Sequence, residues 1–153
     1  MKRLLALAVL AVSVVLVFTV GASARHAQHR ASDTIKVVEH ATTDAVTNGT
    51  KGDHSGNILT FANKVFNAAD TKKVGTDQGS CTRIVVGKSF ECMWTTFLKK
   101  GQITVEGPFY DTSNSVLAIT GGTGAYKDVR GQMKLKYHNP AGTKFDFVFQ
   151  LSH

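Results

Sequence analysis

Most of the chain after residue 33 alternates between apolar and polar residues. A period of two is typical of β-strands that bury one face. Eight stretches show it or form short apolar runs: residues 35–39, 59–65, 81–86, 90–98, 103–105, 116–120, 133–137 and 145–151. No stretch of ten or more residues in this part of the sequence shows the 3.6-residue period of an amphipathic helix. We therefore predict an all-β domain over residues 34–153, with about eight strands joined mostly by short turns.

Closure into a barrel is the arrangement that best suits this number of short strands. Eight antiparallel strands that close on themselves leave no exposed sheet edge, and such edges otherwise invite aggregation. The interior of an eight-stranded barrel either fills with side chains or holds one small ligand. We therefore expect an eight-stranded antiparallel β-barrel whose lumen is the first place to look for function.

The first 24 residues have the pattern of a secretory signal peptide. A short basic start precedes an apolar stretch over residues 4–20, and Ala22 and Ala24 occupy the −3 and −1 positions of a cleavage site. We predict cleavage after Ala24, which makes the protein secreted; an uncleaved membrane anchor is the alternative. Residues 25–33 lack apolar periodicity, so we expect them to form a flexible lead-in to the barrel.

Composition and charge exclude several classes of protein. Hydrophobic residues make up 42% of the chain and charged residues 19%, which excludes wholesale disorder. The basic residues outnumber the acidic ones, 18 to 11, but they form no block beyond pairs such as Lys72–Lys73 and Lys99–Lys100. Nucleic-acid binding usually shows clustered basic residues within a recognisable module. We therefore expect neither nucleic acid nor, after cleavage, a membrane as a partner.

The two cysteines, Cys81 and Cys92, lie eleven positions apart. Two thiols in an exported protein usually pair, and we predict a disulfide; a reactive free thiol is the alternative. Pairing these cysteines places Arg83 opposite Phe90 in a tight hairpin that turns near Gly87. The disulfide and the strand pattern therefore support each other.

Sequence motifs for phosphate or metal binding are weak. The glycine-rich run at residues 121–124 is followed by Lys-Asp and a strand, whereas a phosphate loop needs Lys-Ser/Thr and a helix. A sharp connection between strands, which glycine permits, explains this run better. His40, His54 and His138 have no paired ligand spacing. We predict neither a metal nor a cofactor.

Two polar residues fall in phase with apolar residues on their strands. Glu39 shares a strand face with Ile35 and Val37, and Asn63 shares one with Phe61. If these faces point inward, a buried carboxyl group with a raised pKa becomes a proton donor or a poised base, and the amide orients a ligand. The alternative is that Glu39 is solvated at a strand end and Asn63 bonds to neighbouring backbone.

Several motifs that recur in order over residues 35–151 resemble those of plant allene oxide cyclases. They include LTFANKVF at residues 59–66, GQITVEGPF at 101–109 and LAITGGTG at 117–124. The last of these, with Arg130-Gly131, is also similar to dirigent proteins of the same barrel superfamily. With the predicted signal peptide, the resemblance identifies the chain as a secreted, bacterial-type member of this superfamily. It further implies an eight-stranded barrel with an apolar cavity, commonly assembled as a homotrimer.

The match to the cyclase site is incomplete. The resemblance gives Glu39 the catalytic position and Asn63 a site position. The second site Asn of the cyclases is Ala41 here, and the pocket Tyr after Gly-Pro is Phe109, with Tyr110 next to it. A true allene oxide cyclase is therefore disfavoured, although the barrel itself is expected to remain.

We therefore expect a secreted barrel that binds an apolar small molecule in its lumen and orients it for cyclisation or coupling. Such an activity would be isomerase-like and independent of a cofactor, with Glu39 and Asn63 as the catalytic or polar contacts. The expected aromatic contacts to the ligand are Phe61, Phe109, Tyr110 and Phe147. The alternative is a non-catalytic extracellular barrel with a filled core, used for structure or for interaction.

Overall fold

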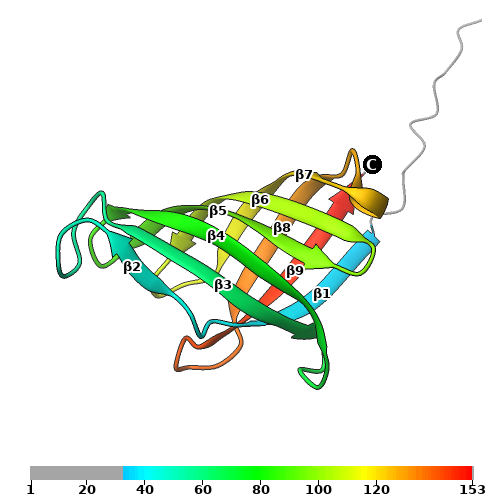
Figure 1. Cartoon of the computed structure of the whole chain (residues 1–153), viewed down its shortest axis with the longest axis horizontal. Helices are drawn as coiled ribbons and strands as arrows, with labels where there is room; N and C mark the ends of the chain where they lie inside the picture. The colour runs from blue at the N-terminus through cyan, green and yellow to red at the C-terminus, as the bar shows by residue number, and fades with distance from the viewer. Residues whose placement is uncertain (1–32, 153) are drawn as a thin grey trace, which may run out of the picture.

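The computed structural model describes residues 33–152, which form nine β-strands and one short 3-10 helix (Figure 1). The elements are β1 (Asp33–His40), β2 (Ala45–Asn48), β3 (Ile58–Asn67), β4 (Lys73–Val85), β5 (Ser89–Leu98), β6 (Gly101–Tyr110), β7 (Ser115–Gly122), η1 (Gly124–Tyr126), β8 (Arg130–Tyr137) and β9 (Lys144–Ser152). The first strand begins one residue before the expected boundary at residue 34. The predicted signal peptide, residues 1–24, and all of the predicted lead-in except Asp33 lie outside the described residues.

Pairing of the first strand on both sides closes the sheet. Neighbouring strands are antiparallel in the order β1-β9-β8-β7-β6-β5-β4-β3-β2, and β1 also pairs with β3, where Glu39 lies opposite Val65. The short β2 pairs with the opposite end of β3, where Ala45 lies opposite Thr60. Together β1 and β2 therefore fill one place beside β3. The predicted eight-stranded antiparallel barrel is confirmed, with β2 as an extra strand.

The four residues of β2 are all exposed, which explains why the sequence pattern did not predict this strand. A strand that buries no face carries no apolar alternation. The last strand shows the opposite case, because Phe145, Phe147, Phe149 and Leu151 are all buried while the residues between them are not. The alternation read from the sequence therefore marks the strands whose inner face belongs to the core.

The β4–β5 hairpin has the register that the cysteine spacing predicts. Cys81 lies opposite Cys92 and forms the disulfide with it, and Arg83 lies opposite Phe90. Two residues earlier in β4, Gly79 lies opposite Trp94, and a Cβ atom on Gly79 would come within 2.3 Å of the Trp94 Cβ atom. The glycine therefore lets the large indole ring lie against the inside of β4.

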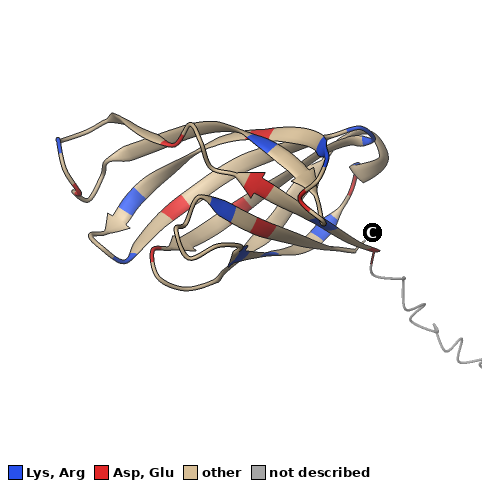
Figure 2. Cartoon of the chain, turned by 90° about the horizontal axis from the view of Figure 1, so that it is seen from below, with Lys and Arg blue, Asp and Glu red and all other residues tan. Residues whose placement is uncertain are grey.

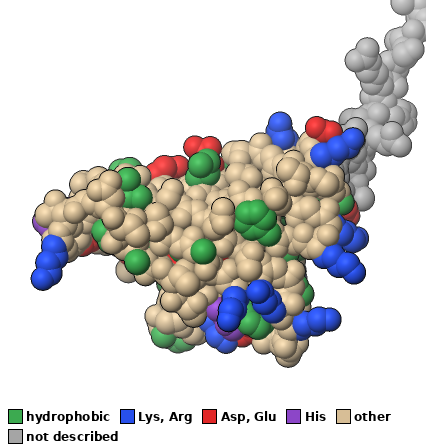
Figure 3. Space-filling view, viewed as in Figure 1, with side chains coloured by type: hydrophobic (Ala, Val, Ile, Leu, Met, Phe, Trp, Pro, Cys, Tyr) green, Lys and Arg blue, Asp and Glu red, His purple; other side chains and the backbone are tan. Residues whose placement is uncertain are grey.

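The outer surface carries charged groups of both signs. Figure 2 shows Lys and Arg interspersed with Asp and Glu over the strands and loops. On the face drawn in Figure 3, the exposed apolar side chains are separated from one another by polar surface. Within residues 33–152, no helix has the length and apolarity needed to span a membrane. The homotrimer implied by the resemblance stays a prediction.

Candidate functional site

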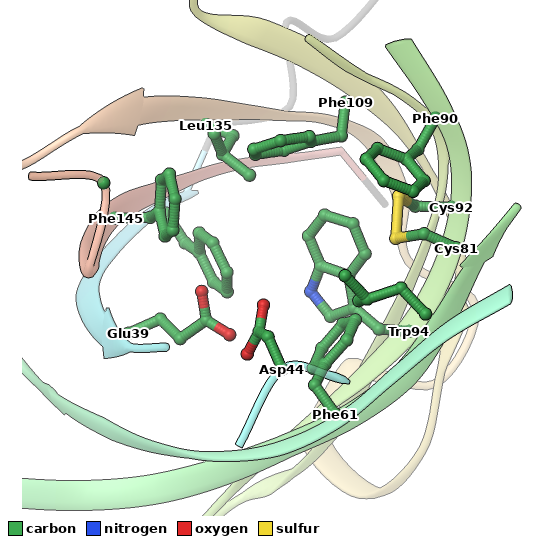
Figure 4. Close-up of a pocket in the computed structure, with 13 residues that line it drawn as sticks. Glu39, Asp44, Phe61, Cys81, Phe90, Cys92, Trp94, Phe109, Leu135 and Phe145 are labelled. Carbon is green, nitrogen blue, oxygen red and sulfur yellow. A yellow bond between two sulfur atoms is a disulfide. The ribbon is translucent and has the colours of Figure 1, made fainter. Parts of the chain in front are cut away.

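A largely apolar cavity of about 160 Å³ lies inside the barrel (Figure 4). Strands β1, β3, β4, β5, β6, β8 and β9 all contribute to its wall, as do the β1–β2 connection through Asp44 and the β8–β9 turn through Gly142. The apolar wall consists of Leu59, Phe61, Cys81, Phe90, Cys92, Trp94, Phe109, Leu135, Phe145 and Phe147. An engineered apolar cavity of about 150 Å³ takes up benzene, so this one has room for one aromatic ring.

Aromatic rings from four strands enclose this space. The ring of Trp94 lies 5.5 Å from that of Phe147 and 6.0 Å from that of Phe61, centroid to centroid. On the opposite side, the ring of Phe109 lies 5.7 Å from that of Phe145. Edge-to-face and tilted contacts at these separations stabilise aromatic clusters beyond their buried area. The wall is therefore held in shape by its own packing.

The polar part of the site is organised around Asn63, which is 1% exposed. Its amide nitrogen donates to Glu39 Oε1 at 2.8 Å and to Asp44 Oδ1 at 2.7 Å. Its amide oxygen accepts hydrogen bonds from the backbone N–H groups of Thr42 and Thr43, at 2.9 and 3.0 Å. The side chain therefore fixes two carboxyl groups from β1 and the β1–β2 connection at the cavity wall.

A third carboxyl group, that of Asp77 on β4, completes the cluster. The backbone N–H of Asn63 donates to Asp77 Oδ1 at 3.2 Å, and Asp77 lies within hydrogen-bond reach of Glu39. Burial, together with the negative charges of Asp77 and Asp44, raises the pKa of Glu39 well above its usual range. Burial also raises the pKa of Asp77 to about 7. A carboxyl group with a raised pKa in a cavity wall is suited to donating a proton.

The indole N–H of Trp94 points into the cavity on the side of Glu39 and Asp44 (Figure 4). Trp94 is 4% exposed, and its Nε1 atom has no hydrogen-bond partner among the described residues. Buried polar groups in folded proteins are nearly always hydrogen-bonded. This donor is therefore available to a group that enters the cavity.

An ion-pair cluster holds the loops at one end of the barrel. Arg83 Nη1 donates to both carboxylate oxygens of Asp111 at 2.7 and 2.9 Å. Its Nε atom lies 2.6 Å from Asp53 Oδ1, close enough for an ion pair but outside hydrogen-bond geometry. The guanidinium also lies 3.6 Å from the ring centroid of Phe90, which lines the cavity. Arg83 therefore connects the β2–β3 and β6–β7 loops to the cavity wall.

The structure brings most of the residues expected at the site to one place. Glu39, Phe61, Phe109 and Phe147 line the cavity, whereas Asn63 lies behind the wall and holds Glu39. Tyr110 is 40% exposed and lies outside the lining, because its neighbour Phe109 points inward on the same strand. We therefore leave Tyr110 out of the proposed site. The functional roles of these residues stay predictions.

Sequence reasoning missed Asp44, Asp77 and Trp94. Two of them could have been found from their spacing to the cysteines, because Asp77 lies four residues before Cys81 and Trp94 lies two residues after Cys92. Residues two or four apart on a strand share a face. Asp44 lies on a connection outside any strand, so no periodic signal marks it.

A sequence model of the family described as allene oxide cyclase matches residues 27–151. The match spans the whole barrel, from β1 to within the last residues of β9. This chain belongs to the allene oxide cyclase family. Family membership agrees with the closed barrel and confirms the resemblance seen in the sequence motifs.

Solved structures with this barrel fold include enzymes with different chemistry. A pyocyanin demethylase is 24% identical, with a TM-score of 0.65 over 78% of this chain and all of the other. The pterocarpan synthase dirigent protein PsPTS1 is 18% identical, with a TM-score of 0.70 over 82% of this chain and 97% of the other. AbnU, an exo-specific intermolecular Diels-Alderase, is 13% identical, with a TM-score of 0.63 over 78% of this chain and 97% of the other. At these identities, the likeness of this family member to the three proteins is one of fold.

Proposed function

We propose that this protein is a secreted barrel that binds a mainly apolar small molecule in its lumen and orients it for reaction. The observation that carries the proposal is the aromatic-lined cavity with a buried carboxyl group of raised pKa, that of Glu39, in its wall. Membership of the allene oxide cyclase family and a fold shared with a dirigent protein and a Diels-Alderase support action on small molecules. The Cys81–Cys92 disulfide is compatible with an oxidising compartment.

Enclosure and orientation are the physical basis of the proposed activity. A ring held between Trp94 and Phe109 is confined to few orientations and is shielded from water by the aromatic wall. Holding reacting groups in one productive geometry lowers a barrier by several kcal/mol without covalent chemistry. A reaction of this kind, such as a ring closure or a coupling, needs no cofactor.

Glu39 is the proposed acid of the site. Its carboxyl group reaches the cavity while Asn63 holds it from behind, so a proton on Glu39 is directed at a ligand oxygen or at a developing negative charge. Asn63 acts as a positioning residue because it does not line the cavity. Asp77 lies beside Glu39, and its negative charge helps to raise the pKa of Glu39.

A non-catalytic barrel with a filled core is the alternative function. That hypothesis expects no cavity larger than a few water molecules. The observed volume of about 160 Å³ is mostly apolar in its lining and matches the size of a single ring. The cavity therefore favours ligand binding over a purely structural role.

Binding is tested by titrating the protein with toluene while its tryptophan indole N–H resonance is followed by NMR. The chain contains one tryptophan, so the spectrum has one such signal and it reports from the cavity wall. We expect the wild type to shift saturably. The variant Leu135→Phe, which adds volume inside the cavity, should bind at least tenfold more weakly.

The matched control is Val116→Phe, because Val116 is 51% exposed and the same volume is then added outside the barrel. This variant should bind toluene like the wild type. An indole resonance that toluene does not move, or equal binding by Leu135→Phe and the wild type, would contradict the proposed function.

A further inference from the structure

The acidic groups at the cavity have no positively charged partner among residues 33–152. The carboxyl groups of Glu39, Asp44 and Asp77 gather around one amide, that of Asn63. The ion pairs within residues 33–152 all involve other acids, which are Asp53, Asp70, Asp111 and Asp146. Arg83 is likewise held by Asp53 and Asp111. The lumen therefore carries an excess of acidic groups.

Such an excess is costly unless something compensates it. Buried carboxyl groups are normally paired with cations or hydrogen-bonded, because removal of a charge from water is unfavourable. Asp77 is 1% exposed, and its Oδ2 atom accepts no hydrogen bond from the described residues. The cost of burying these charges appears as raised pKa values for Glu39 and Asp77. A positive charge in the cavity would let these groups ionise.

The wall beside the acids is suited to the same kind of ligand. Cations are attracted to the faces of aromatic rings, most strongly to that of tryptophan, and aromatic cages hold quaternary ammonium groups in this way. Trp94 and Phe61 lie on the side of the cavity where the carboxyl groups of Glu39 and Asp44 point inward (Figure 4), and the ring of Phe147 packs against that of Trp94. A neutral apolar ring would fill the space but would leave the buried carboxyl group of Glu39 without a counter-charge.

The free N–H of Trp94 is an independent sign that a ligand enters here. It is buried, it has no partner among the described residues, and it points into the cavity. A donor in this position needs an acceptor atom that the apolar part of the wall does not supply. A ligand with an oxygen on its ring would meet this need while its ring fills the apolar space.

We propose that the cavity selects a planar aromatic ligand with a positively charged ring nitrogen held against Glu39 and Asp44, and with an oxygen that accepts the Trp94 indole N–H. This inference rests on the proposed function and specifies the ligand class of the same site. A volume of about 160 Å³ admits one such ring, with any larger part of the ligand at the mouth.

Ligand binding should depend on pH. The charged groups packed against Glu39 are Asp77 from β4 and Asp44 from the β1–β2 connection, with the amide of Asn63 from β3 between them. A bound cation favours the ionised form of the Asp77 carboxyl group, whose pKa is about 7, so binding at neutral pH releases protons. Affinity for a cationic ring therefore rises from pH 5 to pH 8, whereas affinity for a neutral ring of the same shape does not.

The test compares N-methylpyridinium with toluene, two rings of the same shape that differ in charge. Both are titrated at pH 8 and pH 5 against the resonance of the single indole N–H. We expect N-methylpyridinium to bind at least tenfold more tightly than toluene at pH 8, with most of this preference lost at pH 5. Its 3-hydroxy derivative, which adds the oxygen acceptor, should bind at least threefold more tightly than the parent ion.

Two charge-matched variants locate the effect. Asp44→Asn should weaken binding of N-methylpyridinium at least fivefold more than it weakens binding of toluene. Asp146→Asn removes the same charge from a partly exposed position on β9 and should change neither. Loss of affinity in both variants would indicate a general surface effect and overturn the proposal.

The outcomes separate this inference from the proposed function. Toluene binding equal to or tighter than that of N-methylpyridinium would overturn the cationic ligand while leaving the proposed function standing. Failure of both rings to move the indole resonance would overturn both proposals. Equal affinity for the hydroxylated and the parent ion would overturn the contact to Trp94.

Discussion

Replacement of Asp77 by Asn should stabilise the protein at high pH. The substitution keeps an oxygen that accepts the backbone N–H of Asn63, removes a buried ionisable group and presents an amide N–H to Glu39. Because the pKa of Asp77 is raised in the folded state, the folded protein holds this proton at pH values where the unfolded chain has released it. The contribution of Asp77 to stability is therefore greatest below the unfolded value of 3.8 and falls as pH rises towards about 7.

The size of the effect follows from the same two values. A pKa that rises from 3.8 to about 7 corresponds to an upper limit of roughly 4 kcal/mol, at about 1.4 kcal/mol for each pH unit. The difference in unfolding free energy between Asp77→Asn and the wild type should be close to zero at pH 3. It should then grow in favour of the variant up to pH 8.

Urea unfolding followed by the fluorescence of the single tryptophan measures this difference at each pH. Asp146→Asn is the matched control, since Asp146 is partly exposed and paired with His138. Its stability should follow that of the wild type without a widening gap above pH 4. Destabilisation by Asp77→Asn that is constant from pH 3 to pH 8 would refute the account of a buried carboxyl group with a raised pKa.

Three further changes test the packing around the cavity. Removal of the disulfide by Cys81→Ala and Cys92→Ala together should lower the unfolding free energy by about 3 kcal/mol, as read from the urea midpoint, because the bridge restricts the unfolded chain; an unchanged midpoint would contradict this. Gly79→Ala should destabilise the protein by about 2 kcal/mol and shift the Trp94 indole resonance, because the new Cβ atom collides with Trp94. Gly121→Ala is the control and should do neither, because the space around Gly121 is open. Arg83→Gln should lower the unfolding free energy by about 2 kcal/mol, because the contacts to Asp53 and Asp111 are lost. Lys88→Gln on the adjacent turn is the control, and an equal loss of stability in that variant would argue against this explanation.

The barrel was predictable because its strands bury one face each. The alternation in β9 and the pairing of Cys81 with Cys92 fix both the strand positions and one register. The first half of β4, in contrast, contains Gly75, Asp77 and Gly79 at its inward positions, so no apolar period marks it as a strand. Its inner face is built of small and polar residues because a large indole ring and the acid cluster occupy the space beside it.

The candidate site was predictable only in part, for a related reason. Glu39 and Asn63 stand out because each interrupts an apolar face on a recognisable strand. Asp44 becomes part of the site only through the path of the β1–β2 connection, which Asn63 fixes through hydrogen bonds to Thr42 and Thr43. Contacts of this kind depend on three-dimensional closure and leave no mark in the order of residues.

Intermolecular NOEs to bound toluene test the central claim, that the lumen is the binding site, most directly. The structure also has an open hollow of about 420 Å³ whose lining includes Met93, Gln78 and Thr104, and Met93 is 55% exposed. We predict NOEs from toluene to the ring protons of Phe109 and Phe145, which line only the inner cavity. NOEs to the Met93 methyl group without any to these two rings would place the ligand outside the barrel and contradict the account.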